Sequence, residues 1–167
     1  MARRVFFSFH YDEDINRSMI VRNSWVTQGK EAAGFIDKAE FEKIKRNGEN
    51  AVCKWIDKQL EGTSVTVVLI GKETLNRPFV QYEIRKSIER GNAIIGIHIH
   101  NLRDMITQRT TVKGNPHTII GYYKDDTPAY FDYICDDLYD YLEDNGYYNL
   151  GSWIEKAARK KENNCVS

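Results

Sequence analysis

Short segments rich in apolar and β-branched residues alternate along the chain with longer segments whose apolar residues recur every three or four positions. Uninterrupted apolar runs are typical of parallel strands covered on both faces, and the wider spacing is typical of amphipathic helices. The strongest apolar run is TSVTVVLI at residues 63–70. Strands are predicted, in chain order, over residues 4–9, 32–37, 63–70, 93–99 and 117–123.

Five amphipathic helices are predicted in the segments that separate and follow these strands. Their apolar positions are, in chain order, Ile15, Met19, Ile20, Trp25 and Val26; Val52, Trp55, Ile56 and Leu60; Val80, Ile84 and Ile88; Phe131, Ile134, Leu138 and Leu142; and Trp153, Ile154 and Ala157. Pro78 suits the first position of the third helix, with Arg77 as its cap. The other predicted boundaries are Gly29, Gly62 and Gly91, which end the first three helices, Thr127–Pro128 and Asn145–Gly146, which bound the fourth, and Ser152, which starts the fifth.

This alternation of elements predicts an α/β fold with one parallel sheet of about five strands, flavodoxin-like in order, and helices on both faces. A length of 167 residues suits a single domain over residues 1–167. Ligands of such sheets bind beyond the carboxyl ends of the strands. The candidate region therefore comprises residues 10–14, Asp37, residues 71–83 and residues 98–101. No helix or strand is predicted for residues 100–115, which are interpreted as an excursion from the core.

Composition and charge narrow the function classes. The formal net charge is zero, which gives no attraction to nucleic acid or to an anionic membrane. No apolar run is long enough for a signal peptide or a membrane span. The three cysteines have no CxxC spacing, which favours reduced thiols in a cytoplasmic protein over a disulfide framework or a zinc site.

One carboxylate in the predicted third helix is a candidate for chemistry. Glu83 lies about one and a half turns into that helix, at the edge of the face formed by Val80, Ile84 and Ile88. A partly desolvated carboxylate there could stabilise a developing cation or act as a base. The alternative is an exposed glutamate paired with Lys86, three residues further on.

Other candidates carry weaker signals. His98 and His100 are two apart on a strand, which suits metal ligands, but no third ligand is evident and we predict no metal site. Residues 122–148 hold eight of the ten tyrosines and eight carboxylates. That segment is either a recognition surface or a helix whose tyrosines cover the sheet. No GxGxxG, GxxxxGK[ST] or GxSxG motif occurs. The sequence therefore gives no motif support for a classical dinucleotide-binding protein, a P-loop protein or an α/β-hydrolase.

Three stretches resemble the TIR-like domain proteins of the bacterial Thoeris anti-phage defence system, the ThsB family. They are RRVFFSFHYDEDINRSMIVRNSWVT near the start, TSVTVVLIGKETLNRPFVQYEIRKSIERGNAIIGIHI in the middle and YLEDNGYYNLGSWIEKA near the end. The resemblance covers most of residues 3–156, and residues 102–130 depart from it.

The resemblance implies an NAD⁺ glycohydrolase that cleaves the nicotinamide–ribose bond and forms a cyclic ADP-ribose-type signal. It assigns the catalytic role to Glu83 and places Phe9, His10 and Tyr11 against the substrate, with Asp37 added by position alone. It also implies that NAD⁺ is the substrate and that no cofactor is needed. The implied partners are a separate sirtuin-like NADase effector, which reads the cyclic product, and a phage-derived trigger protein.

Two other function classes compete with this one. A catalytically silent TIR-like module that acts by protein–protein contact is the alternative interpretation. A flavodoxin-like receiver is a weaker one, because it needs an aspartate at the end of a middle strand and a later lysine. Here Gly71 follows the strongest strand, and Asp37 has no evident lysine partner.

Overall fold

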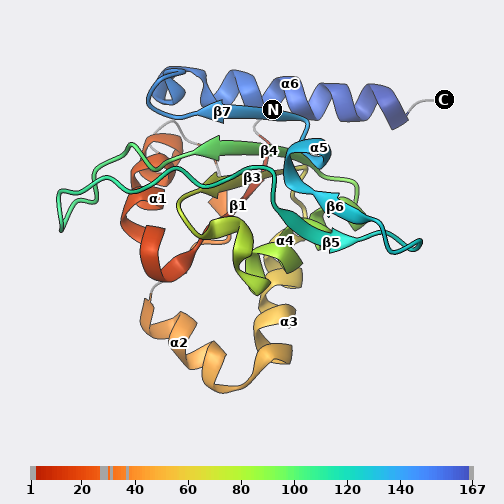
Figure 1. Ribbon diagram of the computed structural model, residues 1–167, viewed down its shortest axis with the longest axis horizontal. Coiled ribbons are helices and arrows are strands. Elements are labelled where there is room, and N and C mark those ends of the chain that lie inside the picture. The colour runs from red at the N-terminus through yellow and green to blue at the C-terminus, as the bar shows by residue number, and fades with distance from the viewer. Residues whose placement is uncertain (1–2, 27–29, 31, 37, 166–167) are drawn as a thin grey trace.

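The protein has a five-stranded parallel sheet with helices on both faces (Figure 1). The computed structural model describes residues 3–26, 30, 32–36 and 38–165. The sheet order is β2-β1-β3-β4-β7, the flavodoxin-like order that the sequence predicts. Its strands are β1 (Val5–Ser8), β2 (Ala32–Ala33), β3 (Val65–Ile70), β4 (Ala93–His98) and β7 (Asp137–Asp140).

Helices cover both faces of this sheet. They are α1 (Tyr11–Val26), α2 (Lys38–Arg46), α3 (Glu49–Leu60), α4 (Pro78–Glu89), α5 (Phe131–Ile134) and α6 (Gly146–Cys165), with a 3₁₀ turn η1 (Thr74–Asn76). A separate antiparallel pair is formed by β5 (Ile119–Tyr122) and β6 (Pro128–Tyr130). No described helix is long and apolar enough to cross a membrane.

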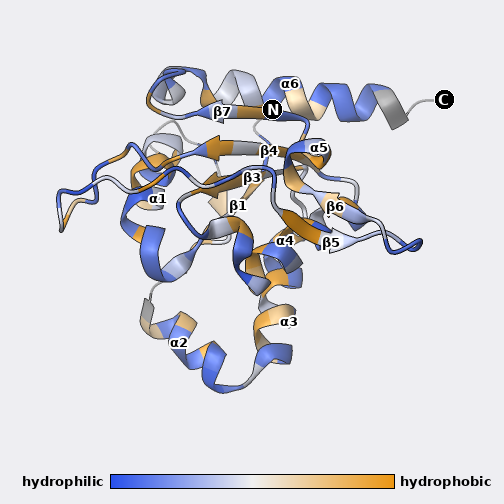
Figure 2. Ribbon diagram, viewed as in Figure 1, coloured by the Kyte–Doolittle hydropathy of each residue, from blue (hydrophilic) through white to orange (hydrophobic). Residues whose placement is uncertain are grey.

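Alternate strand residues build two apolar layers. On β3, Val67 and Leu69 belong to the cluster that includes α1 and α6, whereas Val68 and Ile70 belong to the cluster around α4. All six residues of β3 are buried, as expected for a strand covered on both faces. Figure 2 shows the result: the central strands are hydrophobic, while the outer turns of the helices are hydrophilic.

The predicted helix α4 is confirmed in detail. Arg77 is its N-cap, and Pro78 lies in its first turn. Val80 and Ile84 are buried, whereas Ile88 is 41% exposed because it lies in the last turn. The apolar positions predicted for α3 and for the helix from Ser152 are also buried or half-buried.

The first helix packs on the core with a broader face than the one predicted. Trp25 is buried, and Ile15 and Ile20 are half-buried and pack against the core, as predicted. The buried positions also include Tyr11, Asp14, Arg17, Ser18 and Val21. The reason for the broader face is the excursion at residues 100–115, which is confirmed as lacking helix and strand and which packs its base on α1. Arg17 Nε donates to Leu102 O at 2.9 Å and Arg17 Nη2 donates to Arg109 O at 2.8 Å.

The C-terminal third departs most from prediction. Residues 117–123 do contain a strand, β5, but it pairs with β6 and not with the main sheet. The helix predicted from Thr127–Pro128 is wrong: only four residues form α5, and residues 137–140 form β7, the fifth strand of the sheet. Phe131 and Leu138 both pack over Gly96, whose missing side chain leaves room for them.

Other boundaries also move. Asn145–Gly146 starts α6 instead of ending a helix, with Asn145 in the left-handed conformation at φ 57°. The second strand is only two residues long, and α2, in a segment for which no element was predicted, follows it. Gly29 and Asp37 lie outside the described residues.

Candidate active site

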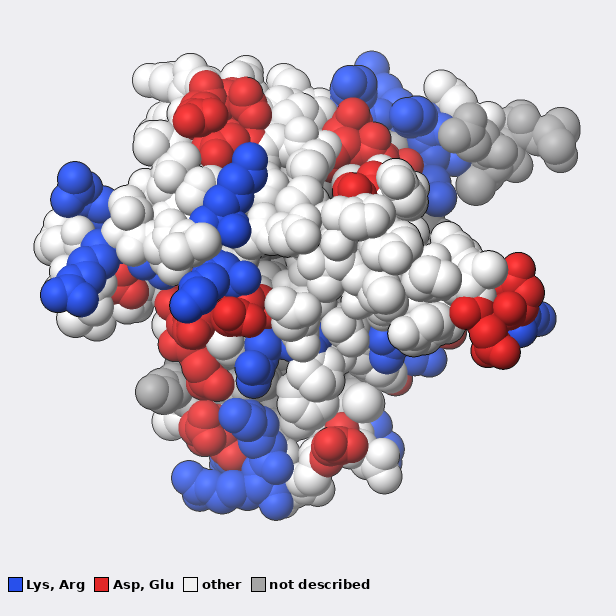
Figure 3. All heavy atoms as spheres, viewed as in Figure 1, with Lys and Arg blue, Asp and Glu red and all other residues white. Residues whose placement is uncertain are grey.

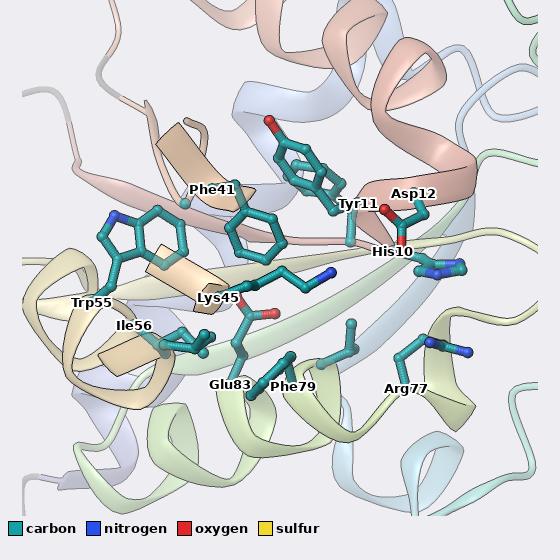
Figure 4. Close-up of a pocket in the computed structure, with 14 residues that line it drawn as sticks. His10, Tyr11, Asp12, Phe41, Lys45, Trp55, Ile56, Arg77, Phe79 and Glu83 are labelled. Atoms are coloured by element: carbon teal, nitrogen blue, oxygen red, sulfur yellow. The ribbon is translucent and has the colours of Figure 1, made fainter. Parts of the chain in front are cut away.

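A cavity of about 240 Å³ opens at the carboxyl end of β1 (Figure 4). Its walls come from the turn after β1, from α2 and α3, and from the first turns of α4. Strand β1 lies between β2 and β3, so the chain moves outward to one side of β1 and then crosses to the other side. Ligands of open α/β sheets bind at such a topological switch point. Its lining residues include Phe9, His10, Tyr11, Phe41, Lys45, Trp55, Arg77 and Glu83.

Glu83 is the acid at the base of this cavity. Its side chain is only 7% exposed, and Ser8 Oγ donates a hydrogen bond of 2.8 Å to Glu83 Oε1. Burial raises the pKa of Glu83 from 4.5 to about 8, and the hydrogen bond from Ser8 opposes that rise. Lys86 pairs with Glu89 at 3.2 Å, so the interpretation of Glu83 as half of a surface ion pair is wrong.

Buried polar side chains fix the helix that carries Glu83. Ser87 Oγ donates to Glu83 O at 2.7 Å, and Thr66 Oγ1 on β3 donates to Ser87 Oγ at 2.7 Å. Asn92 Nδ2 completes the chain by donating to Thr66 Oγ1 at 3.2 Å. The buried side chains of Thr66, Ser87 and Asn92 therefore all have partners, and the helix cannot rotate without breaking these bonds.

Stacked aromatic rings form the wall opposite α4. The ring centroids of Phe9 and Tyr11 lie 5.8 Å apart, those of Tyr11 and Phe41 lie 4.5 Å apart, and Trp55 meets Phe41 edge-on at 6.0 Å. Tyr11 OH donates to Ile36 O, which fixes the orientation of its ring. Such a wall suits a flat heteroaromatic group and excludes water.

Four of the five predicted site residues are thus described, and they meet in one place. Phe9, His10 and Tyr11 line the same cavity as Glu83. Asp37 lies outside the described residues. Their chemical roles stay predictions.

Sequence reasoning missed Phe41, Lys45 and Trp55 as members of the cavity, and it missed Ser8 as the hydrogen-bond donor to Glu83. Arg77 lies within the predicted candidate region of residues 71–83 but was given no role in the site. Ser8 did carry a signal, since it is the one polar residue in the apolar run VFFSF. Phe41 is the only aromatic residue of the charged segment KAEFEKIKR, and a lone aromatic residue there indicates an apolar contact.

The two strand-end histidines lie apart from this cavity. The rings of His98 and His100 meet at 88° with centroids 5.7 Å apart, and neither lines the Glu83 cavity. Burial, followed by the charge of Lys113, lowers the pKa of His98 to about 4.

In the described part of the chain, three potential metal ligands converge only at His10, Glu13 and Asp14. There Asp14 already pairs with Arg17 at 3.1 Å. The absence of a metal site therefore stays a prediction.

The tyrosine-rich segment lines no part of the cavity. Tyr139 stacks on Trp153 of α6 with centroids 4.0 Å apart, and Tyr141 is buried. Five further tyrosines of the segment are exposed: Tyr122, Tyr123, Tyr133, Tyr147 and Tyr148. The predicted helix with sheet-covering tyrosines is wrong, because the segment is divided among a hairpin, a short helix and an edge strand.

Residues 6–104 match the family described as "Thoeris protein ThsB, TIR-like domain". That range includes β1, the aromatic wall and Glu83. The chain belongs to the ThsB TIR-like family. The "Putative cyclic ADP-D-ribose synthase ThsB1" of Bacillus cereus (strain MSX-D12) is 37% identical over an alignment of 191 residues, which covers 92% of this chain and all of that protein.

Among solved structures, the Clostridium botulinum CMP N-glycosidase BcmB aligns with 90% of this chain and 99% of its own. The sequence identity is 14% and the TM-score is 0.44. The ThsB family assignment rests on the sequence matches alone.

The bond from Ser8 makes a testable prediction for this ThsB-family site. In Ser8→Ala the Glu83 carboxylate loses its hydrogen-bond donor, so the pKa of Glu83 is expected to rise by about one further unit. Carbon-13 NMR of labelled glutamate carboxyl groups measures this pKa directly. Ser18→Ala is the matched control, because Ser18 is equally buried on α1 and its Oγ has no partner in the described structure. An unchanged pKa in Ser8→Ala would contradict this role.

Proposed function

We propose that the protein is an NAD⁺ nucleosidase of the ADP-ribosyl cyclase type. In this reaction the bond between C1′ of the ribose and the nicotinamide nitrogen breaks, and the bonding electrons leave with neutral nicotinamide. An oxocarbenium-like ribose remains. A hydroxyl or ring nitrogen of the same molecule's adenosine then attacks C1′ and releases a proton, so the products are a cyclic ADP-ribose, nicotinamide and H⁺.

The observation that carries this proposal is the buried Glu83 in an aromatic cavity of a ThsB-family chain. The name of the Bacillus cereus relative, "Putative cyclic ADP-D-ribose synthase ThsB1", supports the same reaction. A carboxylate in a site of low dielectric stabilises a developing ribose cation strongly, and nicotinamide leaves without a general acid.

The raised pKa of Glu83 fits this role. Near neutral pH the empty protein holds Glu83 largely in its neutral form, since its pKa is about 8. The positive charge of a bound nicotinamide ring favours the carboxylate and lowers that pKa. We therefore infer that Glu83 ionises as substrate binds and is charged when the ribose cation develops.

The aromatic wall favours cyclisation over hydrolysis. Phe9, Tyr11 and Phe41 line the cavity as a stack of rings, and such a wall offers water few hydrogen-bond partners. Without an attacking water, the oxocarbenium-like ribose persists until the adenosine of the same molecule reaches it. Under this proposal the cyclic product is read in the bacterial cytoplasm by a separate sirtuin-like NADase effector, and a phage-derived protein triggers its synthesis.

The test is to incubate the purified protein with NAD⁺ and to follow the products by chromatography and mass spectrometry. The expected result is one nicotinamide for each cyclic product, whose mass is lower than that of ADP-ribose by one water. A second arm measures the same product in extracts of phage-infected cells that express the protein, because infection would supply the trigger. If the purified protein releases no nicotinamide and the infected cells contain no cyclic product, the chain is a catalytically silent interaction module.

A further inference from the structure

The Glu83 cavity is smaller than the substrate assigned to it. Pockets that bury drug-sized ligands measure about 300–1,000 Å³, and a pyridine dinucleotide is larger than such ligands. The cavity measures only about 240 Å³. One end of the dinucleotide therefore fits inside. Glu83 and the aromatic rings select the nicotinamide riboside end, which leaves the diphosphate at the mouth.

Two cationic side chains line that cavity from different walls (Figure 4). Arg77 comes from the N-cap of α4, is exposed, and its guanidinium has no ion pair within the described residues. Lys45 comes from α2 and reaches over the ring of Phe41, with its Nζ 5.5 Å from the ring centroid. Its carboxylate neighbour is Glu42, at 3.7 Å, and both of these side chains are more than a third exposed, so this pair is weak.

The start of α4 adds donors at the same place. No side chain caps its first turn, and Pro78 has no N–H to satisfy. Phe79 and Val80, the next two residues, both line the cavity, so the positive end of the helix faces it. His10 also lines the cavity; it is buried, and its Nδ1 has no hydrogen-bond partner but lies 3.6 Å from Glu13 Oε2.

Charge in the space-filling view is otherwise mixed. In Figure 3, basic and acidic side chains lie beside one another along the left and lower parts of the face, and the centre of the face is uncharged. The cavity is lined by two cations, Arg77 and Lys45, and by two carboxylates, Asp12 and Glu83, of which Glu83 is buried and bonded to Ser8. Arg77 and Lys45 are therefore the groups available to bind a dianionic group.

We propose that Arg77 and Lys45 bind the diphosphate of the dinucleotide at the mouth of the cavity and thereby hold its nicotinamide riboside end against Glu83. This inference rests on the proposed function, whose site it completes. It predicts that the protein discriminates against nicotinamide substrates that lack a diphosphate. An arginine guanidinium binds two phosphate oxygens at once, and the lysine adds a point charge from the other side.

The experiment compares Arg77→Gln, Lys45→Gln and the double variant with the unmodified protein. Lys43→Gln is the matched control, since Lys43 is an exposed cation of α2 that does not line the cavity. We expect kcat/KM for NAD⁺ to fall about tenfold in each single variant and roughly a hundredfold in the double variant. With nicotinamide riboside, which has no phosphate, kcat/KM should change less than about twofold.

A binding measurement keeps the inference separate from catalysis. Calorimetry with ADP-ribose, which retains the diphosphate and lacks nicotinamide, should show a Kd at least about tenfold weaker in the double variant and unchanged in Lys43→Gln. Equal losses for NAD⁺ and nicotinamide riboside, or an ADP-ribose affinity that the double variant leaves unchanged or that is undetectable in the unmodified protein, would overturn the inference. Weakened ADP-ribose binding in a protein that releases no nicotinamide would support it and contradict the proposed function.

Discussion

Replacing Glu83 with glutamine is expected to lower the rate of nicotinamide release by at least about a hundred- to a thousandfold. Glutamine has nearly the same shape and still accepts the hydrogen bond from Ser8, but it carries no charge. The loss therefore measures the interaction between the carboxylate and the developing ribose cation. Because that interaction exists chiefly in the transition state, kcat should fall far more than KM rises.

Two further variants make this result specific. Glu83→Asp keeps the negative charge but shortens the side chain by one methylene, which moves the carboxylate away from the ribose. Its rate should therefore lie between those of the unmodified protein and Glu83→Gln. Glu89→Gln removes a carboxylate from the exposed end of the same helix, where it pairs with Lys86, and should leave the rate unchanged. A Glu83→Gln protein that keeps more than about a tenth of the rate would exclude Glu83 from the reaction.

The position of Glu83 in its helix could be predicted because the signals are local. Arg77 and Pro78 mark the start of α4, and Val80 and Ile84 mark its buried face. The depth of Glu83 could not be predicted, because it depends on Ser8, which is 75 residues away in the sequence. The same holds for the cavity, whose aromatic wall is completed by Phe41 on a nine-residue helix with only two large apolar residues, Phe41 and Ile44.

The fifth strand was missed for a related reason. Phe131, Ile134, Leu138 and Leu142 have helical spacing, yet Leu142 is 59% exposed. Strand β7 forms because its backbone pairs with β4 and because Tyr139 stacks on Trp153. Pairing and stacking with distant residues overrides local periodicity, as expected for an edge strand with few apolar residues. The predicted fold class is still correct, because the sheet has five strands, the number that the sequence predicted.

The reaction itself had a different source. Burial, periodicity and the cavity identify an acid that is held at the carboxyl edge of a sheet, and many chemistries use such an acid. Only the resemblance to the ThsB family, now supported by the match over residues 6–104, points to NAD⁺. Structure and family therefore contribute separate parts of the proposal, and the Glu83 variants test both parts together.

Burying Glu83 should also lower the stability of the protein in a pH-dependent way. Below pH 4.5 the carboxyl group is neutral in both the folded and the unfolded chain, so burial has no ionisation cost. From there to about pH 8 the unfolded chain ionises and the folded chain does not, so the free energy of unfolding falls by about 1.4 kcal/mol per pH unit. Above pH 8 both forms are ionised and the loss is constant. At pH 7 it amounts to roughly 3 kcal/mol.

Glu83→Gln removes this loss, so it should make the protein more stable at pH 8 while lowering the rate of nicotinamide release. The gain should be about 2–3 kcal/mol, because the glutamine amide lacks a second partner in the buried site, and Tm should rise by roughly 5–10 °C. At pH 4.5 the ionisation cost is nearly absent and the cost of the unpaired amide remains, so Glu83→Gln should melt a few degrees below the unmodified protein. Calorimetry or circular dichroism at both pH values measures the difference, with Glu89→Gln as the control for the loss of one charge. An equal shift at both pH values would mean that packing causes the change and that Glu83 ionises in the folded protein as freely as in the unfolded chain, which would also remove the electrostatic argument for its role.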